Sequence, residues 1–199
     1  DASSGVGNTV RIAAGYYLGN YTVDGKSLSI EAVGNVTLAP LVDAPTISIL
    51  DTPEGGLVHL NGLRIETSNP RAMSLDLQDG HAVLASNARI QVTECEFQNC
   101  RVGMGRGQNA RNGAGIKAIV SDIWIDRTDF SSCEASGHGG AIYAYLSTIE
   151  MSESTVSYCE AGTSGGGVSV AVTDLTLSQC DFDGNTAGTD GGHVRFAGG

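Results

Sequence analysis

The sequence predicts an all-β fold, a right-handed parallel β-helix solenoid of roughly seven to nine rungs. Three observations lead to this prediction. A Gly-rich tetrapeptide recurs every 26 residues in the C-terminal half. Apolar and polar residues alternate with a period of two, which is typical of strands with one buried face. The 199 residues include 28 glycines, 4 prolines and 6% aromatic residues, which favours strands and tight turns over packed helices.

The tetrapeptides begin at residues 113, 139, 165 and 191, at three equal intervals. They read Gly113-Ala114-Gly115-Ile116, Gly139-Gly140-Ala141-Ile142, Gly165-Gly166-Gly167-Val168 and Gly191-Gly192-His193-Val194. An earlier copy, Gly80-His81-Ala82-Val83, precedes the next one by 33 residues, and the extra residues predict an extruded loop within 103–113. We expect each copy to form a corner before a strand, where the backbone needs a positive φ or a close approach that glycine allows.

Within one repeat, the alternation places Ile142 and Ala144 inside and Tyr143 outside. A unit this small cannot bury its apolar face alone, so we expect the repeats to stack about 4.8 Å apart. Equivalent residues then form ladders, of which two are clear: Phe97, Phe130, Val156 and Phe182 in the first, and Cys100, Cys133, Cys159 and Asn185 in the second.

We expect one β-helix domain over residues 1–199, with irregular N-terminal rungs in 1–79 and regular 26-residue repeats in 80–199. Strand-like segments with variable turns occur at residues 10–12, 27–30, 46–49 and 57–65. No polar cap follows the last Gly-rich element, although solenoids normally need caps. The chain is therefore expected to be a fragment of a longer one, or to pack end to end with further β-helix subunits.

The repeat resembles a known family. Gly139-Gly140-Ala141-Ile142 and Phe182-Asp183-Gly184-Asn185 match the Gly-Gly-Ala-Ile and Phe-x-x-Asn repeats of chlamydial polymorphic outer membrane proteins. The resemblance covers about residues 80–199, and two further copies carry Cys in place of the Asn, at Cys100 and Cys133. It implies a surface-exposed, adhesin-like passenger built on a β-helix. The Ala14-Gly15-Tyr16 segment also looks like the opening of pectin-lyase-like β-helices.

The formal charge of −11 disfavours nucleic-acid binding, because an acidic surface repels phosphates. No apolar run reaches 18 residues, so we expect no membrane span. We expect an extracellular or cell-surface protein. The triplets at Asn20 and Asn35 are candidate glycosylation sites in a eukaryotic source.

The five cysteines form no Cys-x-x-Cys pair, which disfavours a zinc site. The preferred interpretation is a buried ladder of Cys100, Cys133 and Cys159 acting as small hydrophobic residues. One disulfide among these three is the alternative. Cys95 and Cys180 share another ladder, but they are too far apart to be bridged.

The candidate catalytic set is Asp126, Asp129 and His138, since glycoside hydrolysis needs two nearby carboxylates. Gly137-His138-Gly139 resembles a polygalacturonase tripeptide, but the Asn-Thr-Asp, Asp-Asp and Arg-x-Lys motifs of that family are absent. Solvated turns are therefore the preferred interpretation of all three residues.

Asp181 and Asp183 resemble the start of a calcium loop, but Gly192 occupies the position of its final carboxylate. We therefore expect no cofactor, with Ca²⁺ as the alternative. The candidate binding face is an outward ladder on the stacked repeats, formed by Lys117, Tyr143, Ser169 and Arg195.

The leading functional prediction is a non-enzymatic structural or adhesin-like segment that binds a protein or glycan on a surface. The alternative is a carbohydrate-active enzyme, a polysaccharide hydrolase or lyase, or a glycan-binding module.

Overall fold

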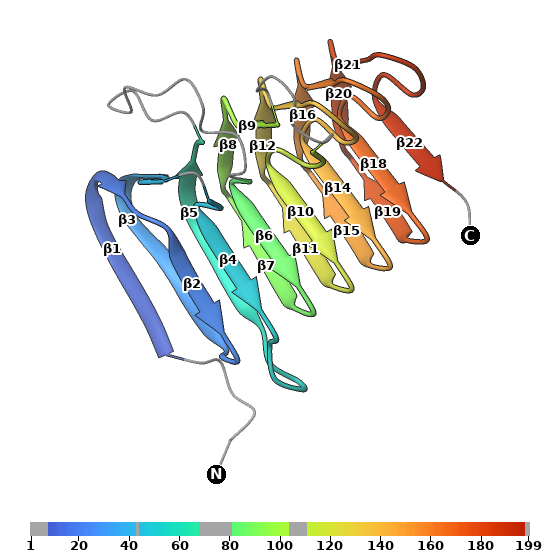
Figure 1. The fold of residues 1–199 in the computed structure, drawn as a ribbon. Helices are drawn as coiled ribbons and strands as arrows, with labels where there is room; N and C mark the ends of the chain where they lie inside the picture. The colour runs from blue at the N-terminus through green and yellow to red at the C-terminus, as the bar shows by residue number, and fades with distance from the viewer. Residues whose placement is uncertain (1–7, 43, 68–80, 104–110, 198–199) are drawn as a thin grey trace.

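The computed structural model describes residues 8–42, 44–67, 81–103 and 111–197, and within them it is all-β with strands only. Gly80, most of the expected loop in 103–113 and the C-terminal Gly198-Gly199 lie outside the described residues. Every pair of neighbouring strands is parallel, so the all-β class and the parallel pairing are confirmed. Figure 1 shows successive strands side by side, from β1 at one end of the molecule to β22 at the other.

The strands form three sheets, named A, B and C here. Sheet B has seven strands: β2 (Tyr21–Asp24), β4 (Ile47–Leu50), β6 (Val83–Ser86), β10 (Ile116–Ile119), β14 (Ile142–Tyr145), β18 (Val168–Ala171) and β22 (Val194–Ala197). Sheet C has four two-residue strands: β9 (Arg101–Val102), β13 (Glu134–Ala135), β17 (Glu160–Ala161) and β21 (Thr186–Ala187).

Sheet A has eleven strands and bends along its length. Its N-terminal strands are long and unbroken: β1 (Asn8–Leu18), β3 (Leu28–Ala39) and β5 (Val58–Ile65). In the regular repeats each long strand is replaced by two short ones. The first of each pair is β7 (Arg89–Thr93), β11 (Asp122–Asp126), β15 (Thr148–Ser152) or β19 (Asp174–Ser178), and the second is β8 (Glu96–Gln98), β12 (Asp129–Ser131), β16 (Thr155–Ser157) or β20 (Asp181–Asp183).

The long strand β5 joins the irregular and regular parts, because it pairs with both β7 and β8. From β10 onward, paired residues are 26 positions apart, as in the hydrogen bond from the Ser121 amide to the Ser147 hydroxyl. The predicted strand segments at 46–49 and 57–65 match β4 and β5 to within one residue at each end, whereas those at 10–12 and 27–30 cover only parts of the longer strands β1 and β3. Sheet pairing is therefore continuous across the boundary expected near residue 80.

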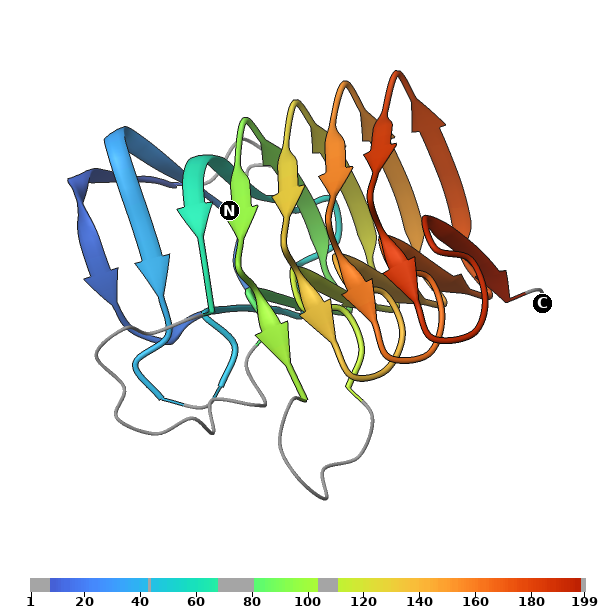
Figure 2. The ribbon, with the colours of Figure 1, turned by 90° about the horizontal axis from the view of Figure 1, so that it is seen from above.

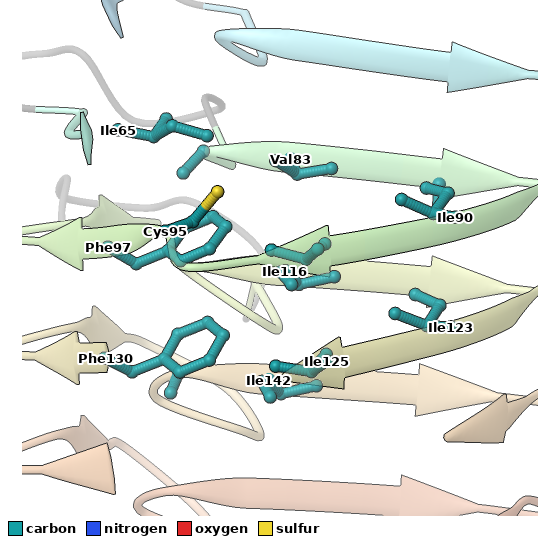
Figure 3. Packing of buried hydrophobic residues seen from close by; sticks show 14 of the residues in the cluster. Ile65, Val83, Ile90, Cys95, Phe97, Ile116, Ile123, Ile125, Phe130 and Ile142 are labelled. Atoms are coloured by element: carbon teal, nitrogen blue, oxygen red, sulfur yellow. The ribbon is translucent and has the colours of Figure 1, made fainter. Parts of the chain in front are cut away.

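The core lies between the sheets, which Figure 2 shows arranged around a shared interior. The predicted aromatic ladder is confirmed by the pairing of β8, β12, β16 and β20. Phe97 and Phe130 stack with ring centroids 4.6 Å apart and planes 9° apart, and Figure 3 shows them one above the other. Stacking of this kind stabilises by about 0.5–1.5 kcal/mol beyond the burial of apolar area.

The predicted cysteine ladder is also confirmed: Cys100, Cys133 and Cys159 are each fully buried, and all five cysteines are free thiols. Asn185 ends the ladder and caps it, since its side-chain oxygen accepts a hydrogen bond from the Cys159 amide over 2.8 Å. A hydrogen bond with the Cys100 thiol, together with burial, raises the pKa of Cys133. The neighbouring Cys133 thiol and burial likewise raise the pKa of Cys159, so Cys133 and Cys159 are packing groups whose thiols stay protonated.

The Gly-rich corners have the geometry that the repeat predicts. Gly113, Gly139, Gly165 and Gly191 have φ values of 69, 67, 68 and 62°. A Cβ at each would overlap the carbonyl oxygen of the residue three positions later, at the start of the next sheet B strand. Glycine is needed there for both reasons, and this explains why the repeat is most regular at these positions.

Candidate functional site

A groove of about 610 Å³ lies on the outer surface of sheet A. It extends across β7, β11, β15 and β19, and residues of the loop before β5 form part of its wall. Its lining residues include Gly55, Leu57, Arg89, Gln91, Trp124, Asp126, Glu150, Ser152, Thr176 and Ser178.

Strand alternation determines which side chains reach this groove. Ile123 and Ile125 are each 1% exposed, so they point into the core and Trp124 between them points outward. The parallel register then aligns Gln91 and Glu150 with Trp124 on the adjacent strands. The groove is therefore built on a row of outward residues spaced by about 4.8 Å.

Trp124 is held in place by Arg89. The guanidinium carbon lies 5.3 Å from the centroid of the indole ring, a cation–π contact. Arg89 is itself anchored, because its side chain lies 3.8 Å from an Asp122 carboxylate oxygen and its amide donates to the Thr52 hydroxyl over 2.8 Å. These contacts favour one orientation of the ring, which reduces the ordering cost of binding.

The two carboxylates in the groove differ in their surroundings. Asp126 accepts a hydrogen bond from the Ser152 hydroxyl at 2.8 Å and pairs with Arg127 at 3.1 Å. Glu150 is exposed and Gln91 is half-buried. Within the described residues, neither side chain forms a hydrogen bond or an ion pair. The polar groups beside Trp124 are therefore available to a ligand.

The three residues of the alternative catalytic set do not converge on this groove. Asp126 lines it, but Asp129 lies on β12 and accepts a hydrogen bond from the Thr155 hydroxyl. His138 lies in the corner between β13 and β14, beside sheet B, with Nδ1 2.9 Å from the Thr163 Oγ1. The turn interpretation therefore fits His138, but it is wrong for Asp126 and Asp129, which lie at the end of β11 and the start of β12.

The expected binding face exists as a row across sheet B, since Lys117, Tyr143, Ser169 and Arg195 pair in register. The expectation that all four point to solvent is wrong for Ser169, which is fully buried. The Gly-rich corner covers this position, because a Cβ on Gly165 would lie 2.7 Å from the Ser169 Cβ. The longer side chains of the row extend beyond the corner and are half-buried.

Asp181 and Asp183 are exposed on β20, two positions apart and on the side of the strand opposite Phe182. In the part of the chain that the structure describes, no three His, Cys, Asp or Glu side chains gather in a way that would hold a metal ion. A calcium site at this pair would therefore need its other oxygen ligands from groups other than carboxylates.

The candidate glycosylation sites differ in accessibility. Asn20 organises the loop after β3, since its Nδ2 donates to the carbonyls of Ala44 and Pro45 and its Oδ1 accepts from the Val42 amide at 3.1 Å. A glycan on Nδ2 would remove one of these donors. Asn35 is exposed at an irregular part of β3, where pairing with β5 shifts between Glu31 and Val36.

The sequence interpretation missed Trp124, Gln91 and Glu150 as candidate binding residues. One signal was available: Trp124 is the sole tryptophan of the chain and occupies an outward position between two buried isoleucines. The contribution of the loop wall at Gly55 and Leu57 had no such signal, because it depends on how that loop folds over sheet A.

No protein-family model matches the chain, and no curated protein matches it. Among solved structures, the fold is similar to that of a "putative glycosyl hydrolase" from Parabacteroides merdae. The TM-score is 0.51 with 12% sequence identity, and the match covers 92% of this chain and 81% of that one. No helix in the described residues is long and apolar enough to cross a membrane. At this identity the similarity concerns the fold alone.

Proposed function

We propose that the chain is a right-handed parallel β-helix solenoid of an extracellular or cell-surface protein, and that it binds a glycan in the sheet A groove. Support for the solenoid comes from the 26-residue register between successive coils and from the three parallel sheets around one core. Support for a surface role comes from the resemblance to the repeats of chlamydial polymorphic outer membrane proteins. In this proposal, the sheet A groove is the site through which the adhesin-like segment binds its glycan.

The observation that carries the proposal is Trp124, an outward aromatic ring in a groove that is also lined by the polar side chains of Gln91 and Glu150. The apolar face of a pyranose ring packs on an aromatic ring, while its hydroxyls need donors and acceptors at the periphery. Gln91 and Glu150 supply such groups on either side of Trp124. The repeated strand spacing also suits a linear polymer, because one strand can present similar groups to each successive sugar.

The test is binding of neutral oligosaccharides to the intact chain. Cellohexaose, xylohexaose and mannohexaose are titrated in turn by calorimetry and by fluorescence of Trp124. We expect at least one to bind, and Trp124→Ala to weaken that binding at least tenfold, or about 1.4 kcal/mol. Tyr145→Ala is the matched control, because Tyr145 is an exposed aromatic residue on sheet B. Failure of all three sugars to bind, or equal affinity of the two variants, would reject the groove.

Hydrolysis of the bound glycan is a second candidate function, favoured by the two carboxylates of the groove. Asp126 and Glu150 lie on adjacent strands with a register offset of two residues. Strand spacing and rise then place their Cβ atoms roughly 8 Å apart. That is compatible with the roughly 6.5–9.5 Å between carboxyl groups of inverting glycosidases. Release of reducing sugar by the wild type, lost in Glu150→Gln with binding retained, would establish hydrolysis; no release would leave binding as the function.

A further inference from the structure

The basic side chains of this acidic chain differ in whether they form ion pairs with carboxylates. Five arginines in or beside sheets A and C each lie within 4 Å of a carboxylate: Arg11, Arg64, Arg89, Arg101 and Arg127. Lys117 and Arg195, both on sheet B, form no ion pair within the described residues. Among the residues that the structure describes, Lys26 also forms no ion pair, but it is exposed, whereas Lys117 and Arg195 are half-buried on one face of a chain with a net charge of −11.

These two cations belong to one row, which also contains Tyr143 and Ser169. Three strand spacings separate Lys117 from Arg195, roughly 14 Å along the row. Both side chains are half-buried beside the Gly-rich corners, so part of their hydration is already lost. A half-buried cation without a partner interacts more strongly with an incoming anion than an exposed one does.

Ser169, the third residue of the row, also has an unsatisfied polar group. The Ser169 hydroxyl is buried and has no hydrogen bond. An unsatisfied buried hydroxyl costs about 1–3 kcal/mol, but the Gly165 corner covers Ser169, so this residue lies beneath the row and does not itself contact a ligand. His138 lies beside the row, with its ring centroid 6.3 Å from that of Tyr143.

The titration of neighbouring groups indicates a positive field. Burial and the nearby Arg195 lower the pKa of His138. Burial and Arg111 lower the pKa of Lys117. Burial, followed by Lys117, lowers the pKa of His81 to about 4, although a hydrogen bond with the Gly113 carbonyl opposes this. In each case the neighbouring charge that acts is a cation, and no carboxylate offsets it.

We propose that Lys117, Tyr143 and Arg195 of the sheet B row, with His138 beside them, bind the anionic groups of an acidic polysaccharide, either sulfates or uronate carboxylates. Lys117 and Arg195 contact two charges on separate sugars of the same polymer, and Tyr143 packs against the sugar between them. This site is on a different sheet from the Trp124 groove and does not depend on it.

The experiment measures binding of dextran sulfate and of polygalacturonate, with uncharged dextran as the blank, in 50 mM salt. The test variant is Lys117→Gln/Arg195→Gln. The matched control is Arg11→Gln/Lys26→Gln, which removes the same net charge from exposed positions away from sheet B. We expect wild type to bind at least one polyanion, the test variant to bind it at least tenfold more weakly, and the control to change less than twofold.

Two results would overturn the proposal: equal losses in both double variants, which would make the effect one of net charge, or no polyanion binding by the wild type. Inorganic sulfate at matched charge serves as a competitor, and if it displaces dextran sulfate as well as the polymer itself does, the polysaccharide assignment fails. Trp124→Ala is expected to retain polyanion binding, so failure of this site and failure of the groove are distinguishable.

Discussion

Replacing Gly139 with alanine should disrupt the corner that starts one repeat. The structure gives two contributions to the cost. The φ of 67° is left-handed, which costs an alanine about 1–2 kcal/mol. The new Cβ would also lie 2.7 Å from the Ile142 carbonyl carbon and still closer to its oxygen, so backbone must move, at about 1–3 kcal/mol. The expected loss of unfolding free energy is therefore about 2–5 kcal/mol.

Gly25→Ala separates the two contributions. Gly25 has a similar φ of 61°, but a Cβ there meets nothing within 4 Å. Its substitution should cost only the conformational part, about 1 kcal/mol once the reduced entropy of the unfolded chain is included. Unfolding in urea, followed by circular dichroism and by Trp124 fluorescence, measures both variants. If Gly139→Ala loses no more than Gly25→Ala, the steric account of the Gly-rich repeat is refuted.

Three further predictions follow from other positions. Val120 has a φ of 50°, in the left-handed region that asparagine tolerates better than valine, and Asn87 occupies the equivalent turn of the preceding repeat. Val120→Asn should therefore raise the free energy of unfolding in urea by about 1 kcal/mol. A lower free energy of unfolding would contradict the strain assigned to Val120. Phe130→Ala removes the stack with Phe97 and should cost about 3–5 kcal/mol, and a cost below 1 kcal/mol would mean that the ladder is not packed as described. Burial lowers the pKa of His81 from 6.5 to about 4. As the pH falls, the unfolded state therefore binds the proton before the folded state does. The free energy of unfolding should decrease by on the order of 3 kcal/mol between pH 6.5 and pH 4. His81→Gln should reduce this pH dependence of the free energy of unfolding. If the free energy of unfolding of His81→Gln changes with pH between 6.5 and 4 as much as that of the wild type, the assignment to His81 is rejected.

The regular half of the fold could be predicted because each repeat reports the same environment several times. Gly139 and its equivalents identify the corner, and the ladder of Phe97 and Phe130 fixes which side chains stack. The alternation at Ile142 and Tyr143 then assigns inside and outside. These are local properties of strands, which a single sequence expresses directly.

The site was harder to predict because it depends on what covers each outward position. Ser169 alternates as an outward residue, yet the corner at Gly165 buries it. Trp124 has the same alternation, but on sheet A its ring meets Arg89 and opens into a groove. Asn20 matches a glycosylation triplet, while its amide is engaged by a loop that is distant in sequence. The alternation of apolar and polar residues shows which way a side chain points, but it does not show which other segments of the chain pack over it.

The most direct test of the central claim is a crystal structure of the intact chain with the tightest-binding neutral oligosaccharide from the titrations. The account predicts a sugar ring packed on Trp124, with hydroxyls in hydrogen bonds to Gln91 and Glu150. A sugar bound elsewhere with the Trp124 groove unoccupied would contradict it.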